Sequence, residues 1–143
     1  MKVIRAGGML RAALFLGVLA CMWGCGSGGS TPPASIEYVV LGTNMNGVAA
    51  IDLSLSYDSS KLSSPTVTQG ALISAALFVP NTNTPGSIHL AVVSAAPLSG
   101  SGPIAQISFA AHNGAPDITI SAISLLDGAG HTITGPLVTV GVK

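Results

Sequence analysis

Residues 48–57 read Val-Ala-Ala-Ile-Asp-Leu-Ser-Leu-Ser-Tyr, and this stretch decides the fold class. Apolar side chains occupy positions 51, 53, 55 and 57, and polar side chains occupy positions 52, 54 and 56. Such an alternation puts successive side chains on opposite faces of a β-strand, with one face toward a core and the other toward solvent. The stretch therefore predicts a half-buried strand whose outer face carries Asp52, Ser54 and Ser56.

The same period of two recurs along the rest of the chain. It is clear at residues 87–92, 105–109, 117–121 and 137–140, and shorter candidate strands are residues 37–41, 66–68, 77–79 and 131–134. Turn residues such as Asn113-Gly114 and Gly135-Pro136 separate these segments. Only residues 70–78 could hold even a short helix. We therefore expect an all-β domain over residues 36–143, a two-sheet antiparallel sandwich of about eight to nine short strands.

Residues 1–25 have the features of an export signal. Lys2, Arg5 and Arg11 flank or precede an apolar run at residues 12–23. That run is shorter than the roughly 20 residues that cross a bilayer core, and it fits the apolar region of a secretory signal. Cys21 and Cys25 each follow a small residue, and residues 26–35 form a Gly/Ser/Pro-rich tether.

This arrangement resembles a bacterial lipoprotein signal, in which the peptidase cuts before an acylated cysteine. The resemblance implies export and attachment to the envelope or cell surface by a lipid anchor only. We expect Cys25 to carry the lipid, with Cys21 as the alternative, because the tether begins directly after Cys25. An ordinary cleaved signal with two incidental cysteines is the other interpretation. In both cases residues 36–143 contain no cysteine, so the core and not a disulfide must stabilise the domain.

Charge and motif content exclude several classes of function. Five Lys and Arg among 143 residues give no electrostatic footprint for nucleic acid. The folded part has no nucleophile elbow, no phosphate-binding glycine loop and no zinc signature. Glu37 and Asp52 could be imagined as a glycosidase pair, but solvated carboxylates are the simpler interpretation. We therefore expect a non-catalytic protein without a cofactor or metal, in which His89, His112 and His131 are surface or edge residues.

Aromatic residues are too few for a flat sugar-stacking platform. The chain has one Trp, Trp23, which belongs to the signal. Among the others, Tyr57 and Phe109 stand in register with residues expected to face the core. Binding to a crystalline polysaccharide through stacked rings is therefore not expected.

Four motifs in order resemble the cohesin family. Residues 47–62, Gly-Val-Ala-Ala-Ile-Asp-Leu-Ser-Leu-Ser-Tyr-Asp-Ser-Ser-Lys-Leu, are similar to an early cohesin strand that ends in a Tyr-Asp pair. Residues 67–72 (Val-Thr-Gln-Gly-Ala-Leu) and 102–109 (Gly-Pro-Ile-Ala-Gln-Ile-Ser-Phe) resemble the next two motifs, and the segment from Asp127 to Val142 resembles the closing hairpin.

The resemblance implies a jelly-roll sandwich of nine strands, related in fold to carbohydrate-binding modules. In cellulosome scaffolds a cohesin receives an enzyme's dockerin, which itself binds calcium, on one flat sheet face. Asp52 matches an acidic position of that face, whereas Ser94-Ala95-Ala96 stand where such cohesins carry acidic residues. We take Asp52, Ser54 and Ser56 as the candidate partner-binding face.

Three functions remain open at this point. The first is an anchored module for docking or adhesion, whose partner is a dockerin-like protein or another envelope protein. The second is a carbohydrate-binding module in polysaccharide use. The third is a structural lipoprotein that assembles with itself or tethers another envelope protein. Calcium-dependent capture of a partner would point to docking, and retention on insoluble polysaccharide would point to sugar.

Overall fold

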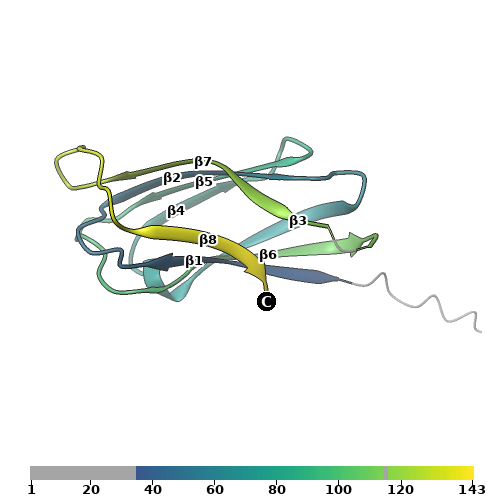
Figure 1. The fold of residues 1–143 in the computed structure, drawn as a ribbon, viewed down its shortest axis with the longest axis horizontal. Coiled ribbons are helices and arrows are strands. Elements are labelled where there is room, and N and C mark those ends of the chain that lie inside the picture. Colours follow the sequence, from purple (N-terminus) through teal and green to yellow (C-terminus); the bar gives the residue numbers. More distant parts are fainter. Residues whose placement is uncertain (1–34, 115) are drawn as a thin grey trace, which may run out of the picture. The chain divides into compact units, whose positions relative to one another are not determined.

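Two antiparallel sheets pack face to face in the computed structural model, which describes residues 35–114 and 116–143. The described part contains eight strands, and Figure 1 shows them in two layers. In one sheet the strand order is β3 (Leu62–Gln69), β6 (Gly102–His112), β1 (Ile36–Thr43) and β8 (Leu137–Val142). In the other it is β4 (Leu77–Asn81), β5 (Ser87–Val93), β2 (Ala50–Tyr57) and β7 (Ile118–Leu126). The predicted all-β sandwich is confirmed.

Residues 131–134 do not form the strand that their alternation predicts. They contribute a single bridge, Thr132 opposite Leu126, next to a hydrogen bond of 2.8 Å from the Ile133 amide to the Leu125 carbonyl. The side chain of Asp127 accepts hydrogen bonds of 2.8 Å from the amides of Ala129 and His131. These bonds hold residues 127–131 as a loop, so the segment meets β7 over one pair only. The helical potential of residues 70–78 is realised only as a 3-10 turn, Ala71–Ile73.

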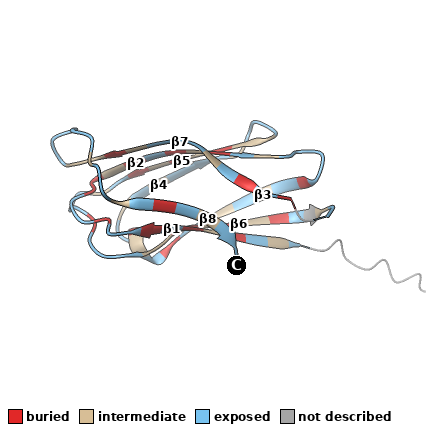
Figure 2. Cartoon of the chain, in the orientation of Figure 1, coloured by how far each residue is buried: buried red, intermediate tan, exposed pale blue. Residues whose placement is uncertain are grey.

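The core lies between the sheets and is built from the inward positions of the alternating strands. Leu53, Leu55, Ile107 and Phe109 have no exposed surface, as predicted for alternating inward positions. Figure 2 shows buried and exposed segments following one another along the strands. Ile120, which the alternation also places in the core, is only partly buried. Its strand β7 is at the edge of its sheet, so one flank of its side chain has no neighbouring strand to cover it.

An irregularity in β7 shapes the sheet that carries the candidate residues. The register between β2 and β7 shifts between Ser54 and Leu55, because Ser121 is an extra residue in β7. The Ser121 hydroxyl donates a hydrogen bond of 3.1 Å to the Ser54 carbonyl. Such a bulge locally increases the twist of the strand pair. The centre of β2 is therefore held between β5 on one side and a kinked β7 on the other.

Candidate functional site

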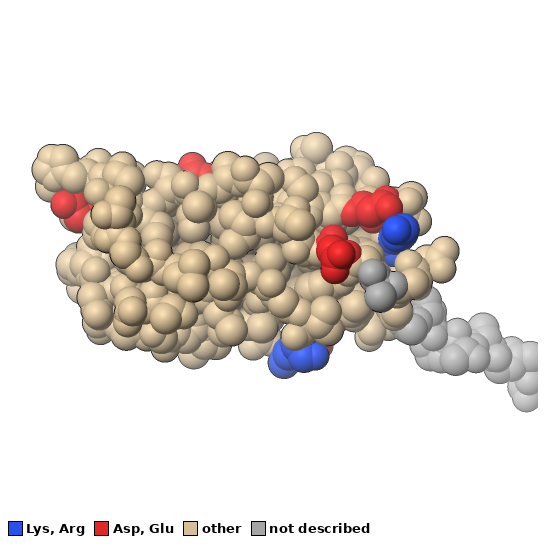
Figure 3. Space-filling model, in the orientation of Figure 1, with Lys and Arg blue, Asp and Glu red and all other residues tan. Residues whose placement is uncertain are grey.

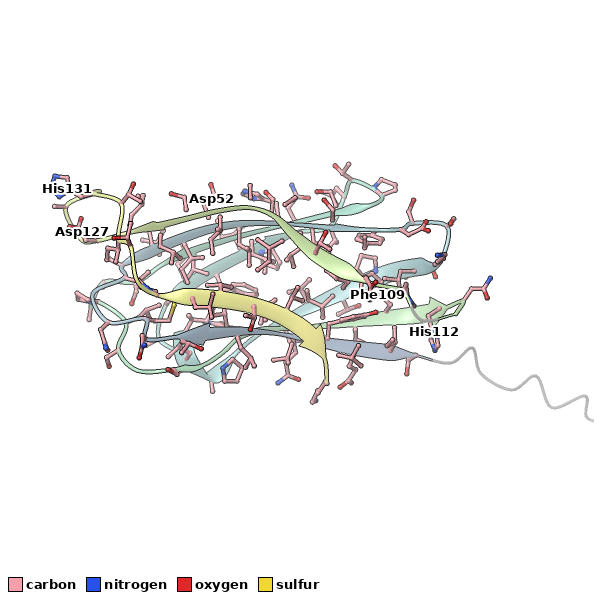
Figure 4. The ribbon with its side chains drawn as sticks, in the orientation of Figure 1. Asp52, Phe109, His112, Asp127 and His131 are labelled. Atoms are coloured by element: carbon pink, nitrogen blue, oxygen red, sulfur yellow. The ribbon has the colours of Figure 1, made fainter. Side chains whose placement is uncertain are left out.

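The candidate partner-binding residues Asp52, Ser54 and Ser56 lie on β2, a central strand of the sheet β4-β5-β2-β7. Asp52 and Ser56 are exposed and Ser54 is half-buried, whereas their neighbours Leu53 and Leu55 are fully buried. The predicted outward orientation of the row is therefore present in the structure. Figure 4 shows Asp52 on the outer side of its sheet and Phe109 between the two sheets. That these residues contact a partner stays a prediction.

Strand register extends this row into a four-strand surface. Residues directly opposite one another in neighbouring strands share a face of the sheet. Asp52 is opposite Ala91 of β5 and Ser124 of β7, and Ala91 is in turn opposite Val79 of β4. We call the outward side of β4, β5, β2 and β7 the outer face.

The outer face is polar at one end and apolar at the other. Toward the polar end, Ser54 is opposite His89, and His89 is opposite Asn81. At the apolar end, the row that crosses all four strands contains no polar side chain and consists of Leu77, Val93, Ala50 and Leu126. Leu77 is 66% exposed, Val93 56% and Val79 51%, so a contiguous apolar surface is in contact with solvent. Covering such a surface with a partner is favourable, because apolar area is then removed from water.

A contact between the side chains of His89 and Asp52 lies beside the apolar end. Nε2 of His89 lies 2.7 Å from Oδ1 of Asp52, within hydrogen-bond distance. The Asp52 side chain is 64% exposed and that of His89 45% exposed. Ser54 is opposite His89 in the register, so Asp52 and His89 are diagonal neighbours across the β2–β5 pair. Long side chains reach such diagonal partners on one face of a sheet.

Sequence reasoning treated His89 as one of three scattered surface histidines and missed this pairing. Both residues interrupt an apolar alternation in mid-strand, which places each on an outer face. The sequence does not reveal which strands are neighbours or in what register, and those two facts bring the imidazole to the carboxylate. The apolar end was missed for the same reason, because its members come from four strands.

The other candidate groups do not come together. Glu37 is on β1 of the opposite sheet, where its carboxylate lies 2.9 Å from the Lys143 amine, so it forms no catalytic pair with Asp52. His112 and His131 lie at opposite ends of the sandwich in Figure 4. In the described ranges, no group of three or more His, Cys, Asp or Glu side chains could hold a metal ion. Cys21 and Cys25 are outside the residues that the structure describes.

Two carboxylates outside the outer face serve loop structure. The pKa of Asp58 is lowered mainly by a hydrogen bond from the Ser60 hydroxyl and next by one from the Ser60 amide, and the charge of Lys61 adds to this effect. The backbone amide of His131 is the main cause of the lowered pKa of Asp127. Both acids cap turns through these bonds, which explains their positions without a ligand.

Aromatic rings are turned toward the core. Tyr38 and Phe109 are buried, and Tyr57 and Phe78 are half-buried. In the part of the chain that the structure describes, these residues therefore provide no flat, exposed stacking platform.

A groove of about 710 Å³ runs between β7 and the segment from Thr132 to Val138, with Ile123, Ile133 and Leu137 among its lining residues.

The family is decided by comparison with known proteins. A model of the family described as "Cohesin domain" matches residues 34–141. The chain belongs to the cohesin domain family. This cohesin has eight strands in its described part where the resemblance implied nine. Comparison with curated proteins gives no match. In the described residues of this cohesin, no helix is long and apolar enough to cross a membrane.

Solved cohesins share the fold of this cohesin. A non-cellulosomal cohesin from the archaeon Archaeoglobus fulgidus is 24% identical, with a TM-score of 0.64 over 71% of this chain and 74% of that one. The OlpC cohesin of Clostridium thermocellum, solved in complex with the dockerin Doc435, is 17% identical, with a TM-score of 0.60 over 71% and 78%. The sixth cohesin of scaffoldin B from Acetivibrio cellulolyticus, solved with a Cel5 dockerin, is 19% identical, with a TM-score of 0.54 over 71% and 82%.

Proposed function

We propose that this cohesin is a non-catalytic docking module, anchored to the envelope, that binds a dockerin-type partner through the outer face. The observation that carries the proposal is the outer face itself: an exposed apolar end next to a central carboxylate, Asp52. The proposal is supported by membership of the cohesin family and by the solved cohesins that hold dockerins, those of Clostridium thermocellum and Acetivibrio cellulolyticus.

The chemistry of the outer face suits a protein surface better than a sugar. A carbohydrate ligand needs ring stacking and several directed hydrogen bonds. In the described residues, Tyr38 and Phe109 are buried, and Tyr57 and Phe78 are partly buried against the core. A protein interface combines an apolar centre with a polar rim and few buried charges. Leu77, Val79 and Val93 provide aliphatic contact area, and Ser54 and Ser56 provide hydroxyl groups beside it.

Asp52 is the residue whose loss best tests this function. The purified domain, residues 26–143, is titrated by calorimetry with a panel of calcium-loaded dockerins that includes Doc435. For a dockerin that binds, Asp52→Ala is expected to weaken binding by about tenfold or more, because a carboxylate desolvated in a complex contributes more than an exposed ion pair. The melting temperature is expected to stay that of the wild type, since Asp52 is exposed.

Glu37→Ala is the matched control. Glu37 is also an exposed carboxylate with a side-chain partner, Lys143, but it lies on β1 of the sheet that does not form the outer face. Its affinity for the dockerin is expected to equal that of the wild type. Absence of binding to every dockerin in the panel, or equal weakening by both substitutions, contradicts docking through the outer face. Retention of the wild-type domain on insoluble polysaccharide would point instead to the carbohydrate-binding function.

A further inference from the structure

In the four described strands β4, β5, β2 and β7, the outer face carries one acid and one imidazole and no other ionisable side chain directed outward. β4 and β7 contain no Asp, Glu, Lys, Arg or His, β2 contributes Asp52, and β5 contributes His89. The remaining ionisable side chain of these strands, Tyr57, packs on Phe109 in the core with ring centroids 5.1 Å apart. The charge of this surface therefore depends on one contact between two residues.

On the side of the molecule that Figure 3 shows, acidic and basic side chains lie in small, separate groups on a largely uncharged surface. Those near the ends of these four strands are engaged elsewhere or lie beyond the strands. Asp58 and Lys61 follow β2, and Nζ of Lys61 lies 3.6 Å from Oδ2 of Asp58. Asp127 follows β7, and its carboxylate contacts the imidazole of His131. Asp117 directly precedes β7. In the described part of the chain, Asp52 is thus the acid that faces His89, and no Lys or Arg lies on the outer face to compete for it.

We propose that His89 sets the charge that the outer face offers, so that the partner places a Lys or Arg side chain on Asp52 and docking weakens when His89 is protonated. This inference rests on the proposed docking function and names the partner chemistry and the regulation of that site.

The two protonation states of His89 give the face different charges. A neutral imidazole donates its Nε2 hydrogen to Oδ1 of Asp52 and leaves the carboxylate with a full negative charge. The same carboxylate can then accept a charge-assisted hydrogen bond from a cationic partner side chain. A protonated imidazole makes the pair neutral and sets a positive charge 2.7 Å from the carboxylate oxygen. A docking cation then meets a compensated acid and a like charge.

Histidine is suited to this role because it changes charge between about pH 5 and pH 8. Contact with a partner also strengthens the effect. The aliphatic side chains of Leu77, Val79 and Val93, exposed in the free domain, exclude water from the neighbouring Asp52 carboxylate once a partner covers them. Electrostatic interactions are stronger in such a desolvated environment than on a free surface.

The test compares dissociation constants at about pH 7.5 and about pH 5.5 for wild type, His89→Gln and His131→Gln, using the dockerin that binds most tightly in the calorimetric panel. The wild type is expected to lose about three- to tenfold in affinity at the lower pH, the size of one partly shielded ion pair. His89→Gln keeps an amide beside Asp52 without a titratable charge, and its affinity is expected to change less than twofold beyond the change shared by all variants.

His131→Gln is the matched control, because His131 also contacts an aspartate, at 3.3 Å, but in the loop after β7. It is expected to follow the wild type at both pH values, which separates the effect of His89 from any titration of the dockerin itself. Binding at pH 7.5 with the same pH ratio in His89→Gln and wild type overturns this inference alone. Tighter binding by the wild type at pH 5.5 also overturns it, since the partner would then carry an anion. Absence of binding overturns the docking function and the inference together.

Discussion

At the scale of single residues, Phe109 connects the two sheets. Its ring, on β6, is fully buried. It packs edge-to-face with two tyrosine rings, Tyr38 of β1 at 6.0 Å and Tyr57 of β2 at 5.1 Å between ring centroids. The Tyr38 hydroxyl donates a hydrogen bond to the Pro116 carbonyl. Burial, with the nearby charge of Asp117, raises the pKa of Tyr38 above its usual value. These contacts direct the rings of Tyr38, Tyr57 and Phe109 toward the core and away from a ligand on the outer face.

Phe109→Ala tests this core contact. We expect the substitution to lower the free energy of unfolding by about 3–5 kcal/mol, because it removes a buried ring and leaves a cavity between the sheets. Ser56→Ala, on the exposed face of β2, is expected to change it by less than about 0.5 kcal/mol. Urea unfolding followed by circular dichroism measures both. Similar losses for the two variants would show that the assigned faces are wrong.

At the scale of elements, the end of β3 approaches β6 so closely that only glycine fits. The Gly70 amide donates a hydrogen bond of 2.8 Å to the Ile104 carbonyl. A Cβ at position 70 would stand 2.2 Å from the Pro103 carbonyl oxygen, and backbone atoms cannot move aside as a flexible side chain can. Gly70 therefore determines how the chain leaves β3 and enters the 3-10 turn that begins at Ala71.

Gly70→Ala is expected to destabilise the domain by more than about 2 kcal/mol, since the two strands must separate to admit a methyl group. Gly141→Ala is the matched control, because a Cβ at Gly141 of β8 meets no atom within 4 Å. Thermal unfolding of both variants provides the measurement. If Gly70→Ala melts at the wild-type temperature, β3 and β6 are further apart than described.

At the scale of the whole molecule, the sequence predicts that residues 26–35 tether the folded domain to a lipid anchor. If Cys25 is acylated, the full chain expressed in a bacterial host is expected to incorporate labelled palmitate and to partition into a detergent phase. Cys25→Ser is expected to abolish both properties. Labelling that persists until Cys21 is also replaced would assign the lipid to Cys21, and an unlabelled wild type would contradict the anchor.

The sequence by itself determined the fold class and the outward orientation of the β2 row. A period of two needs no knowledge of partners, because each residue's face follows from its neighbours along the strand. This is why Leu53 and Leu55 could be assigned to the core and Asp52 to the surface. The same local argument was wrong for residues 131–134, where the side chain of Asp127 binds backbone amides and holds a loop.

Only the tertiary structure decided which outward residues share a surface. Asp52 and His89 are 37 positions apart, and Leu77, Val93, Ala50 and Leu126 come from four strands. Their contacts depend on the order β4-β5-β2-β7 and on strand register, including the extra residue Ser121. Order and register are set by how both sheets bury their inner faces together, and alternation within one strand carries no information about that packing.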